Sequence, residues 1–359
     1  MNLWATKKFA FTQMFTDSLR SNSSSSMFSN QHDDSVCVII VNYNSGELLK
    51  RCLKCLEGQT FRRFHTLLVD NGSTDESITS LKANLNRFQL ILNRCNIGFA
   101  AANNLAIREA KAEWVALLNP DAFPEPEWLS NLMRAARNRP GYSFFASKLI
   151  SADNPRVLDG AGDNYHVSGL VWRRGHGNTA QGNMNELREV FAPCAAAALY
   201  RRSALIEAGG FDEDFFCYVE DVDLGFRLRL AGHRCLYVPQ AVATHVGSAT
   251  TGNNSDFCVY QGHRNLVWAF VKDMPGILFW LLLPLHVLLN LLTIVWFALR
   301  GRGGIIWRAK RDALLGLPKM WRKRQHIQKT RIASIGEIWR QLDKRMITTK
   351  LARKNEWMG

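Results

Sequence analysis

The chain has 359 residues, of which 47% are hydrophobic and 21% are charged. This composition excludes a disordered protein and suffices for one large domain or a domain with an appendage. The formal net charge is +14, and residues 300–359 alone hold 17 Lys and Arg against 4 Asp and Glu. A nearly neutral body with a basic, Trp-containing tail favours an anionic membrane surface over nucleic acid as the partner of that tail, although a solvated helical tail would have the same composition.

The N-terminal segment and the cysteines give little sign of secretion. Residues 1–35 contain a run of Ser but no apolar stretch followed by a small-residue cleavage site, so we expect a flexible leader. Cys52 and Cys55 form a C-x-x-C pair with no second pair and no thioredoxin-like flanks. We expect reduced cysteines packed on a helix, in preference to a redox or metal site, and therefore a cytoplasmic location.

Apolar runs that stop at polar turn residues alternate with helical patterns from Val36 onward. The runs predict buried strands over residues 36–41, 66–70, 90–92 and 114–118, and helices over residues 47–56 and 99–112. This alternation predicts an α/β fold with a doubly wound, mostly parallel sheet. The strands end at Asn42, Asp70 and Asn119–Asp121, at the edge where such sheets bind ligands.

Two later segments carry further candidates. Residues 140–191 are rich in Gly and contain the pair Arg173-Arg174, which fits an acceptor-binding insertion and a mobile loop equally well. Residues 209–224 place carboxylates among aromatic side chains at the start of a helix. The helix dipole alone would explain acids in a first turn, but burying them beside aromatic rings is costly unless some of them are functional.

Six short motifs follow one another between residues 36 and 264: Val41–Asn44, Val69–Ser73, Asn96–Ala100 with Asn103-Asn104, Leu118–Asp121, Gly209–Glu213 and Tyr218–Leu224. Each motif is weak alone, but the six in this order resemble the glycosyltransferase family 2 enzymes, and within them the rhamnosyltransferase-like members that build bacterial surface polysaccharides. The resemblance implies a GT-A fold and an inverting transfer of a sugar from a nucleoside diphosphate to an acceptor hydroxyl.

The resemblance also implies site residues. The expected donor nucleotide site is formed by Val41, Tyr43, Asn44, Asp70, Asn71, Asn96, Gly98, Asn104 and Asn119. Asp121 is the expected metal ligand, and Asn119 stands where the family motif often has its first Asp. His245 is the expected second ligand, although a structural role fits it equally well. Oxygen ligands suit Mg2+ and Mn2+, and a nitrogen ligand favours Mn2+. No Gly-rich phosphate loop is present, so a metal or basic side chains must meet the phosphate charge.

An inverting transfer needs one base beside the acceptor hydroxyl, and we assign that role to Asp221. Glu220 is expected to orient the acceptor or the base. Asp223 is expected to pair with Arg227, its i+4 neighbour.

Residues 276–299 are apolar and long enough to span a bilayer, although Pro284, His286 and Asn290 interrupt them. A single span would put the basic tail across the membrane from a cytoplasmic catalytic domain, against the positive-inside tendency. We therefore expect peripheral or monotopic attachment to the cytoplasmic face of the inner (plasma) membrane, with a buried core or dimer helix as the alternative. The expected organisation is a flexible leader over 1–35, a GT-A domain over 36–265, and an apolar helix with a basic helical tail over 266–359.

The favoured function is transfer of L-rhamnose from dTDP-rhamnose to a glycan or lipid-linked glycan in bacterial surface polysaccharide synthesis. Alternatives are a family 2 transferase for a galactosyl, glucosyl or galactofuranosyl group, a nucleotidyltransferase on a similar sheet, and a non-catalytic protein that docks to membranes or nucleic acid. Motifs fix the reaction type, whereas the shape of the pocket fixes donor, acceptor and linkage. The sequence also leaves the oligomeric state open.

Overall fold

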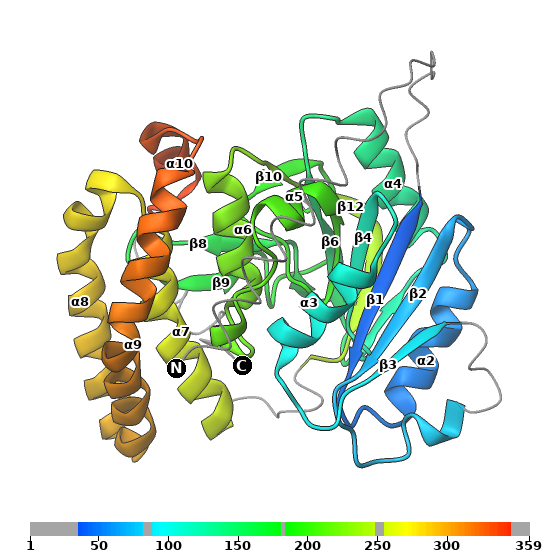
Figure 1. Cartoon of the computed structure of the whole chain (residues 1–359), viewed down its shortest axis with the longest axis horizontal. Helices are drawn as coiled ribbons and strands as arrows, with labels where there is room; N and C mark the ends of the chain where they lie inside the picture. The colour runs from blue at the N-terminus through cyan, green and yellow to red at the C-terminus, as the bar shows by residue number, and fades with distance from the viewer. Residues whose placement is uncertain (1–34, 82–87, 181–183, 248–254, 346–359) are drawn as a thin grey trace, which may run out of the picture. The chain divides into compact units, whose positions relative to one another are not determined.

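A computed structural model describes residues 35–81, 88–180, 184–247 and 255–345 (Figure 1). The strands are β1 Val36–Asn42, β2 Phe64–Asp70, β3 Gln89–Leu92, β4 Trp114–Leu118, β5 Ala122–Pro124, β6 Phe144–Ser151, β7 Leu158–Gly160, β8 Asp163–Tyr165, β9 Val171–Arg173, β10 Arg188–Val190, β11 Ala197–Arg201 and β12 Cys235–His245. The helices are α2 Glu47–Glu57, α3 Phe99–Glu109, α4 Trp128–Asn138, α5 Arg202–Glu207, the 3-10 helix η2 Glu213–Phe215, α6 Glu220–Leu230, α7 Asp256–Asp273, α8 Gly276–Leu299, α9 Gly303–Lys329 and α10 Ile335–Gln341. The predicted leader lies outside the described residues except for Ser35.

The main sheet has the order β10-β12-β6-β11-β4-β1-β2-β3, with β5 paired to β12 and β7 to β6. β4, β1, β2 and β3 run parallel to one another, and the register places Asn42 beside Asp70. β12 also runs parallel to β6, whereas β11 pairs antiparallel with both β4 and β6. The doubly wound, mostly parallel α/β prediction is confirmed, and the strand-helix alternation did not predict the antiparallel pairings of β5, β7, β10 and β11.

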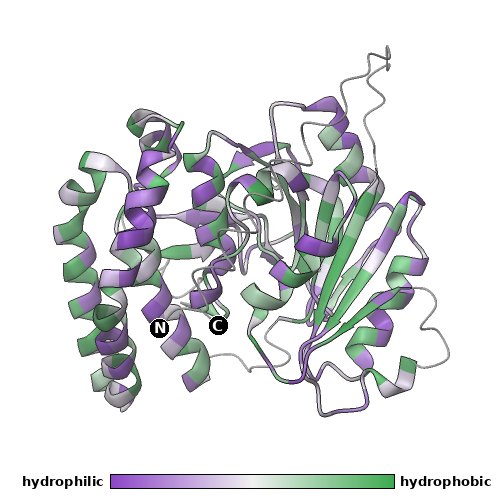
Figure 2. Cartoon of the chain, viewed as in Figure 1, coloured by the Kyte–Doolittle hydropathy of each residue, from purple (hydrophilic) through white to green (hydrophobic). Residues whose placement is uncertain are grey.

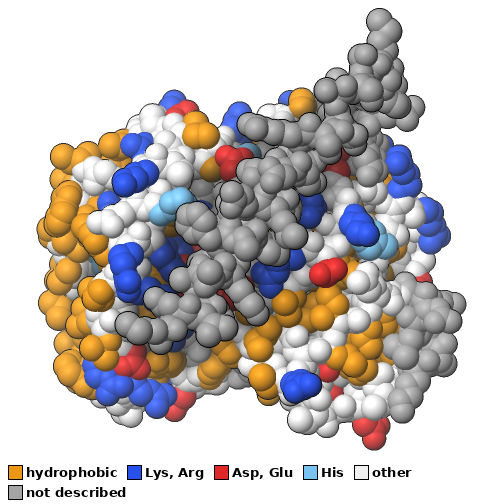
Figure 3. Space-filling view, viewed as in Figure 1, with side chains coloured by type: hydrophobic (Ala, Val, Ile, Leu, Met, Phe, Trp, Pro, Cys, Tyr) orange, Lys and Arg blue, Asp and Glu red, His pale blue; other side chains and the backbone are white. Residues whose placement is uncertain are grey.

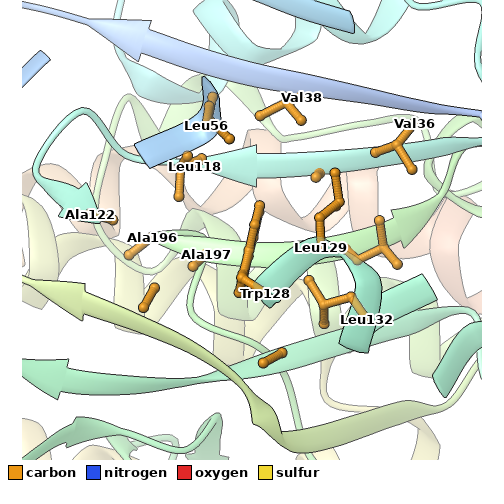
Figure 4. Close-up of a cluster of buried hydrophobic side chains, with 14 of the residues drawn as sticks. Val36, Val38, Leu56, Leu118, Ala122, Trp128, Leu129, Leu132, Ala196 and Ala197 are labelled. Atoms are coloured by element: carbon orange, nitrogen blue, oxygen red, sulfur yellow. The ribbon is translucent and has the colours of Figure 1, made fainter. Parts of the chain in front are cut away.

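Side chains of β1 alternate between the two faces of the sheet, as the pleat of a strand requires. Val36, Val38 and Ile40 belong to a buried cluster with α2 and α4, while Cys37, Ile39 and Val41 belong to a second cluster with α3. Figure 4 shows Trp128 of α4 at the centre of the first cluster, and its Nε1 donates a hydrogen bond to Ser147 Oγ at 2.8 Å. Burial on both faces explains why β1 reads as a continuous apolar run.

Residues 140–191 are built into the protein as β6 to β10, and Leu158 and Tyr165 are fully buried. Cys52 and Cys55 lie on α2 as unpaired thiols.

The C-terminal helices form a layer beside α6. α7 packs against both α6 and α9, and α8 packs against α9 on its side away from the sheet (Figure 1). α8 is apolar except at a few positions such as His286 and Asn290, and its interior contacts come from a few residues such as Leu278, Phe279 and Leu282 (Figure 2). Within the chain α8 is therefore not a buried core helix, and the alternative of a dimer helix stays a prediction. α7 runs through the boundary expected between residues 265 and 266, and that division stays a prediction.

Candidate active site

A cavity of about 690 Å³ opens where β1, β2 and β4 end. Nine of the predicted site residues line it: Val41, Tyr43, Asn71, Asn96, Asn119, Asp121, Glu220, Asp221 and His245. Asn44, Asp70, Gly98 and Asn104 are not among its lining residues. Most of the residues predicted from the sequence therefore lie at one cavity, and the other four do not line it.

Asp70 ties the ends of β1 and β2 together. Its Oδ1 accepts hydrogen bonds from Asn42 Nδ2 at 3.0 Å and from Ser73 Oγ at 2.6 Å. Asn44, whose backbone is left-handed at φ 51°, accepts from the Thr74 amide at 2.8 Å through Oδ1. Buried polar groups that are paired in this way make the loops after both strands rigid.

Asn71 and Gly98 position the segment after β3 and Phe216 at the cavity. Asn71 Nδ2 donates to Asn96 Oδ1 at 2.9 Å, and its own Oδ1 accepts from the Ile97 amide at 3.2 Å. Gly98 has φ 88°, and a Cβ there would lie 2.6 Å from the ring of Phe216. Only glycine permits both this backbone conformation and this close approach. Gly98 thus brings Phe216 to the cavity wall.

Asn104 of α3 bonds to the loop before α6 and not to the cavity. Its Oδ1 accepts from the Phe211 amide at 2.8 Å, and its Nδ2 donates to the Phe211 carbonyl at 2.9 Å and to Glu213 Oε1 at 3.0 Å. The residue therefore anchors the loop before α6, and its predicted contact with the nucleotide stays a prediction.

Asp121 and His245 meet on one wall of the cavity. Asp121 lies in the turn after β4, His245 ends β12, and Asp121 Oδ1 is 3.4 Å from His245 Nε2. His245 Nδ1 lies 2.8 Å from Asp159 Oδ2, whose carboxylate also pairs with Arg173 at 2.6 Å. Burial by itself lowers the pKa of His245, but hydrogen bonds to Asp121 and Asp159 and their charges outweigh it and raise this pKa to about 9. Burial raises the pKa of Asp121, but the bond and charge of His245 bring it below its ordinary value.

This arrangement fits a divalent ion. Many metal-binding histidines offer one ring nitrogen to the ion and donate the other N–H to a carboxylate, which fixes the orientation of the ring. Asp159 occupies that second position, so Nε2 is held toward Asp121 and the cavity. Among the described residues no group of three or more His, Cys, Asp or Glu side chains is placed to hold a metal. The protein would supply two ligands, and a diphosphate and water would supply the rest.

Glu220 and Asp221 begin α6 and line the same cavity as Asp163, and the charge of Asp221 acts on the carboxyl of Asp163. Burial, followed by the charge of Asp221, raises the pKa of Glu220 well above its ordinary value, and Glu220 Oε2 has no hydrogen-bond partner. Burial also raises the pKa of Asp221, although the amides of Ala195 at 3.1 Å and Val222 at 2.8 Å partly oppose this. A carboxylate with a raised pKa is a stronger base than an ordinary one.

The pair expected within α6 is present: Arg227 Nε donates to Asp223 Oδ2 at 2.9 Å. Sequence reasoning missed Asp159 and Asp163, which are 7% and 4% exposed. Both lie on the short strands β7 and β8, where three-residue segments give no periodic signal. The Arg173-Arg174 pair was noticed in this region, and Arg173 lines the cavity together with Trp172 and His176. Residues of the segment 140–191 therefore form part of the cavity wall, and its interpretation as an acceptor-binding insertion stays a prediction.

The family model for glycosyl transferase family 2 matches residues 37–209. An N-acetylglucosaminyl-diphospho-decaprenol L-rhamnosyltransferase of Mycobacterium tuberculosis is 31% identical over 264 residues, covering 67% of this chain and 85% of the relative. The chain belongs to glycosyltransferase family 2. Its resemblance to the rhamnosyltransferase-like members is thereby confirmed.

Two solved glycosyltransferases share the fold. GalNAc-T7, solved with UDP, GalNAc and Mn2+, has a TM-score of 0.55 at 15% identity, covering 73% of this chain and 56% of that protein. The mannosyltransferase PcManGT from Pyrobaculum calidifontis, solved with GDP-Man and Mn2+, has a TM-score of 0.50 at 16% identity, covering 92% of this chain and 94% of that protein. The expected GT-A fold is confirmed.

Proposed function

We propose that this glycosyltransferase moves L-rhamnose from dTDP-rhamnose to a lipid-linked glycan with inversion, using Asp221 as base. The observation that carries the proposal is that one cavity contains the strand-end polar residues, the Asp121–His245 pair and the acids of α6. The L-rhamnosyltransferase relative supports the choice of sugar and of a lipid-linked acceptor.

In the proposed reaction Asp221 takes the proton of the acceptor hydroxyl while that oxygen bonds to the anomeric carbon and the bond to the diphosphate breaks. Asp121 and His245 would hold Mg2+ or Mn2+, which would supply positive charge to the departing diphosphate. The oxygens Glu220 Oε2 and Asn119 Oδ1 are buried without a hydrogen-bond partner, an uncommon arrangement that a functional role of these two residues would explain.

The test is a panel of nucleotide sugars with Mg2+ or Mn2+ and a polyprenyl-diphosphate-linked acceptor, measured as transfer. Asp221→Asn should keep donor binding and lose about 10²- to 10⁴-fold in transfer rate, the usual contribution of a general base. Asp153→Asn, an exposed acid away from the cavity, is the matched control and should transfer normally. Normal turnover by Asp221→Asn would refute the assignment of the base, and preference for another sugar would refute the choice of donor.

We also propose that α8 and α9 attach the protein to the cytoplasmic leaflet without crossing it. α8 is long and apolar enough to cross a membrane. Only 22% of its most apolar stretch is buried inside the protein, so most of this apolar surface is exposed. Its exposed side chains include Ile277, Trp280, Leu281, Leu288, Leu292 and Leu299, and Figure 3 shows hydrophobic surface along this side of the molecule. α7 before it and α9 after it both pack on the domain, so both ends of α8 return to one side.

Replacing Ile277, Leu281, Leu288 and Leu292 together with Ser tests this attachment while keeping every interior contact of α8. The variant should lose binding to vesicles of phosphatidylglycerol and phosphatidylethanolamine and keep its rate on a water-soluble acceptor. Ile206→Ser on α5, an equally exposed apolar residue, is the control and should bind as the parent does. Retained vesicle binding by the fourfold variant would contradict the proposal.

A further inference from the structure

The backbone just before Glu220 is strained. Phe216, Tyr218 and Val219 have φ values of 65°, 65° and 70°, in the left-handed region that residues other than glycine rarely adopt. Val219 is also β-branched, which makes this conformation more costly for it. Such a conformation persists only where the surrounding structure imposes it. A specific set of contacts must therefore hold this loop.

Asn265 of α7 supplies the main contact. Its Nδ2 donates to three carbonyls of the loop, those of Phe215 at 2.9 Å, Cys217 at 3.0 Å and Tyr218 at 2.8 Å. The left-handed turns point these carbonyls at one place, where they would repel each other without a shared donor. Asn265 is 0% exposed, so water cannot replace it.

Arg264 fixes the amide of Asn265 in the orientation that this contact needs. Arg264 Nε donates to Asn265 Oδ1 at 3.0 Å, which turns Nδ2 toward the loop. The same guanidinium donates to the Asp214 carbonyl at 3.3 Å and to the Phe215 carbonyl at 3.2 Å, and it lies over the ring of Trp268 at 4.3 Å. The amide is therefore held from both sides.

We propose that Asn265 is a positioning residue, which holds the loop of residues 215–219, with its left-handed Phe216, Tyr218 and Val219, and so places Glu220 and Asp221 in the cavity. The inference rests on the proposed role of Asp221 as base. Val219 is the N-cap of α6, so the direction in which that helix begins depends on this loop. α7 lies beside α6 in Figure 1 and reaches the loop without contributing Asn265 to the cavity lining. A displacement of about 1 Å at a reacting group can cost about 100-fold in rate.

Asn265→Asp tests the inference because it keeps the volume of the side chain and removes both N–H donors. We expect kcat to fall about 100-fold while the KM for the nucleotide sugar stays within about threefold, since the strand-end residues are untouched. Amide hydrogen exchange should rise in residues 215–223. Asn131→Asp is the matched control: Asn131 of α4 is buried and donates to the Gln240 carbonyl at 2.7 Å, outside the cavity lining. It should keep both kcat and the exchange of residues 215–223.

The outcomes separate this inference from the proposed function. A parent protein that transfers sugar and an Asn265→Asp variant with the same kcat would overturn the inference and leave the function standing. Equal losses of kcat in both variants would also overturn it, because the effect would then be general destabilisation. A parent that transfers no sugar would refute the function, and unchanged exchange in residues 215–223 of Asn265→Asp would still overturn the inference.

Discussion

The strand-end half of the cavity, formed by the loops after β1, β2 and β3, differs in construction from the α6 half, formed by Glu220, Asp221 and the groups around them. In the strand-end half, amides and hydroxyls bond to one another and to the Asp70 carboxylate over a few tens of residues, as between Asn42 and Asp70 at 3.0 Å. In the α6 half, charged and buried groups come from α6, α7, α9 and β7 to β9. The geometry of the strand-end half follows from the pairing of parallel strands. The geometry of the α6 half requires the C-terminal helices to be packed against the domain.

Lys272 of α7 illustrates best how charged, buried groups from distant helices meet beside α6. It is 1% exposed, lies 2.7 Å from Asp212 Oδ2 and pairs with Asp223 of α6. Burial by itself lowers the pKa of Lys272, but the charges of Asp223, Asp273 and Asp212 outweigh it and raise this pKa above its ordinary value. The ammonium is thus a charged bridge between α7, α6 and the loop before α6.

The largest expected effect is on stability, and it follows from Lys272→Met. Removing one partner of a buried ion pair leaves unpaired charge, so the free energy of unfolding should fall by about 3–5 kcal/mol. Ser73→Ala in the strand-end half removes a hydroxyl that donates to the Asp70 carboxylate at 2.6 Å, and the loss of this hydrogen bond to a charged group should cost about 1.5–3 kcal/mol. Urea unfolding of both variants measures the two values.

Lys50→Met is the control for Lys272→Met, because Lys50 pairs with Glu47 on the surface of α2. An exposed pair of this kind contributes about 0–1 kcal/mol. Equal losses for Lys272→Met and Ser73→Ala would remove the energetic distinction between the two halves.

The second largest expected effect is a loss of sugar transfer in Asp121→Asn. The carboxylate is the one charged oxygen ligand that the turn after β4 offers to the proposed ion, and a bound ion contributes several kcal/mol to charge stabilisation. We expect about a 100- to 1000-fold loss of kcat/KM with Mn2+, measured by release of the nucleotide diphosphate. The exposed Asp153→Asn should show no loss, and an Asp121→Asn variant with parental activity would remove Asp121 from the metal site.

Asp159→Asn should have a smaller effect, limited to affinity for the ion. Its carboxylate orients His245 from 2.8 Å, and loss of such an outer partner usually lowers metal affinity about 10- to 100-fold. Raising the Mn2+ concentration should therefore restore activity to Asp159→Asn, whereas it should not restore Asp121→Asn. A loss of activity that no concentration of Mn2+ reverses would contradict the role of Asp159.

The smallest expected effect is a shift of the pH profile. A base must be deprotonated, and burial raises the pKa of Asp221, so kcat/KM should fall with decreasing pH at a higher pH than an ordinary aspartate would give. The charge of Arg173 lowers this pKa, so Arg173→Gln should move the acid limb further toward neutral pH. An acid limb that moves the other way, or not at all, in Arg173→Gln would show that Asp221 does not titrate as proposed.

The sequence predicted the strand-end half of the cavity better than the α6 half. The ends of β1, β2 and β4 were predictable because apolar runs stop there at polar residues, and Asp121 was found this way. Asp159 and Asp163 were missed because they lie on strands of three residues, with no repeat to mark them. Asn265 was missed because a single Asn in a helix has no pattern, and its partners are 47 to 50 residues away in the chain. Long-range packing, which periodicity does not record, brings Asp163 to the cavity and places Asp159 and Asn265 against residues that line it.

The basic tail holds fewer free charges than its composition suggests. Lys310 donates to the His263 carbonyl, Arg324 to the carbonyls of Val271 and Met274, and Lys319 and Lys323 pair with Asp214. Lys310 and Arg324 are buried, and Lys319 and Lys323 are paired with an acid, so these four cations attract anionic headgroups less than free surface cations would. Adsorption through this surface should therefore weaken with ionic strength less steeply than the formal charge implies, because the apolar side chains of α8 would carry most of it.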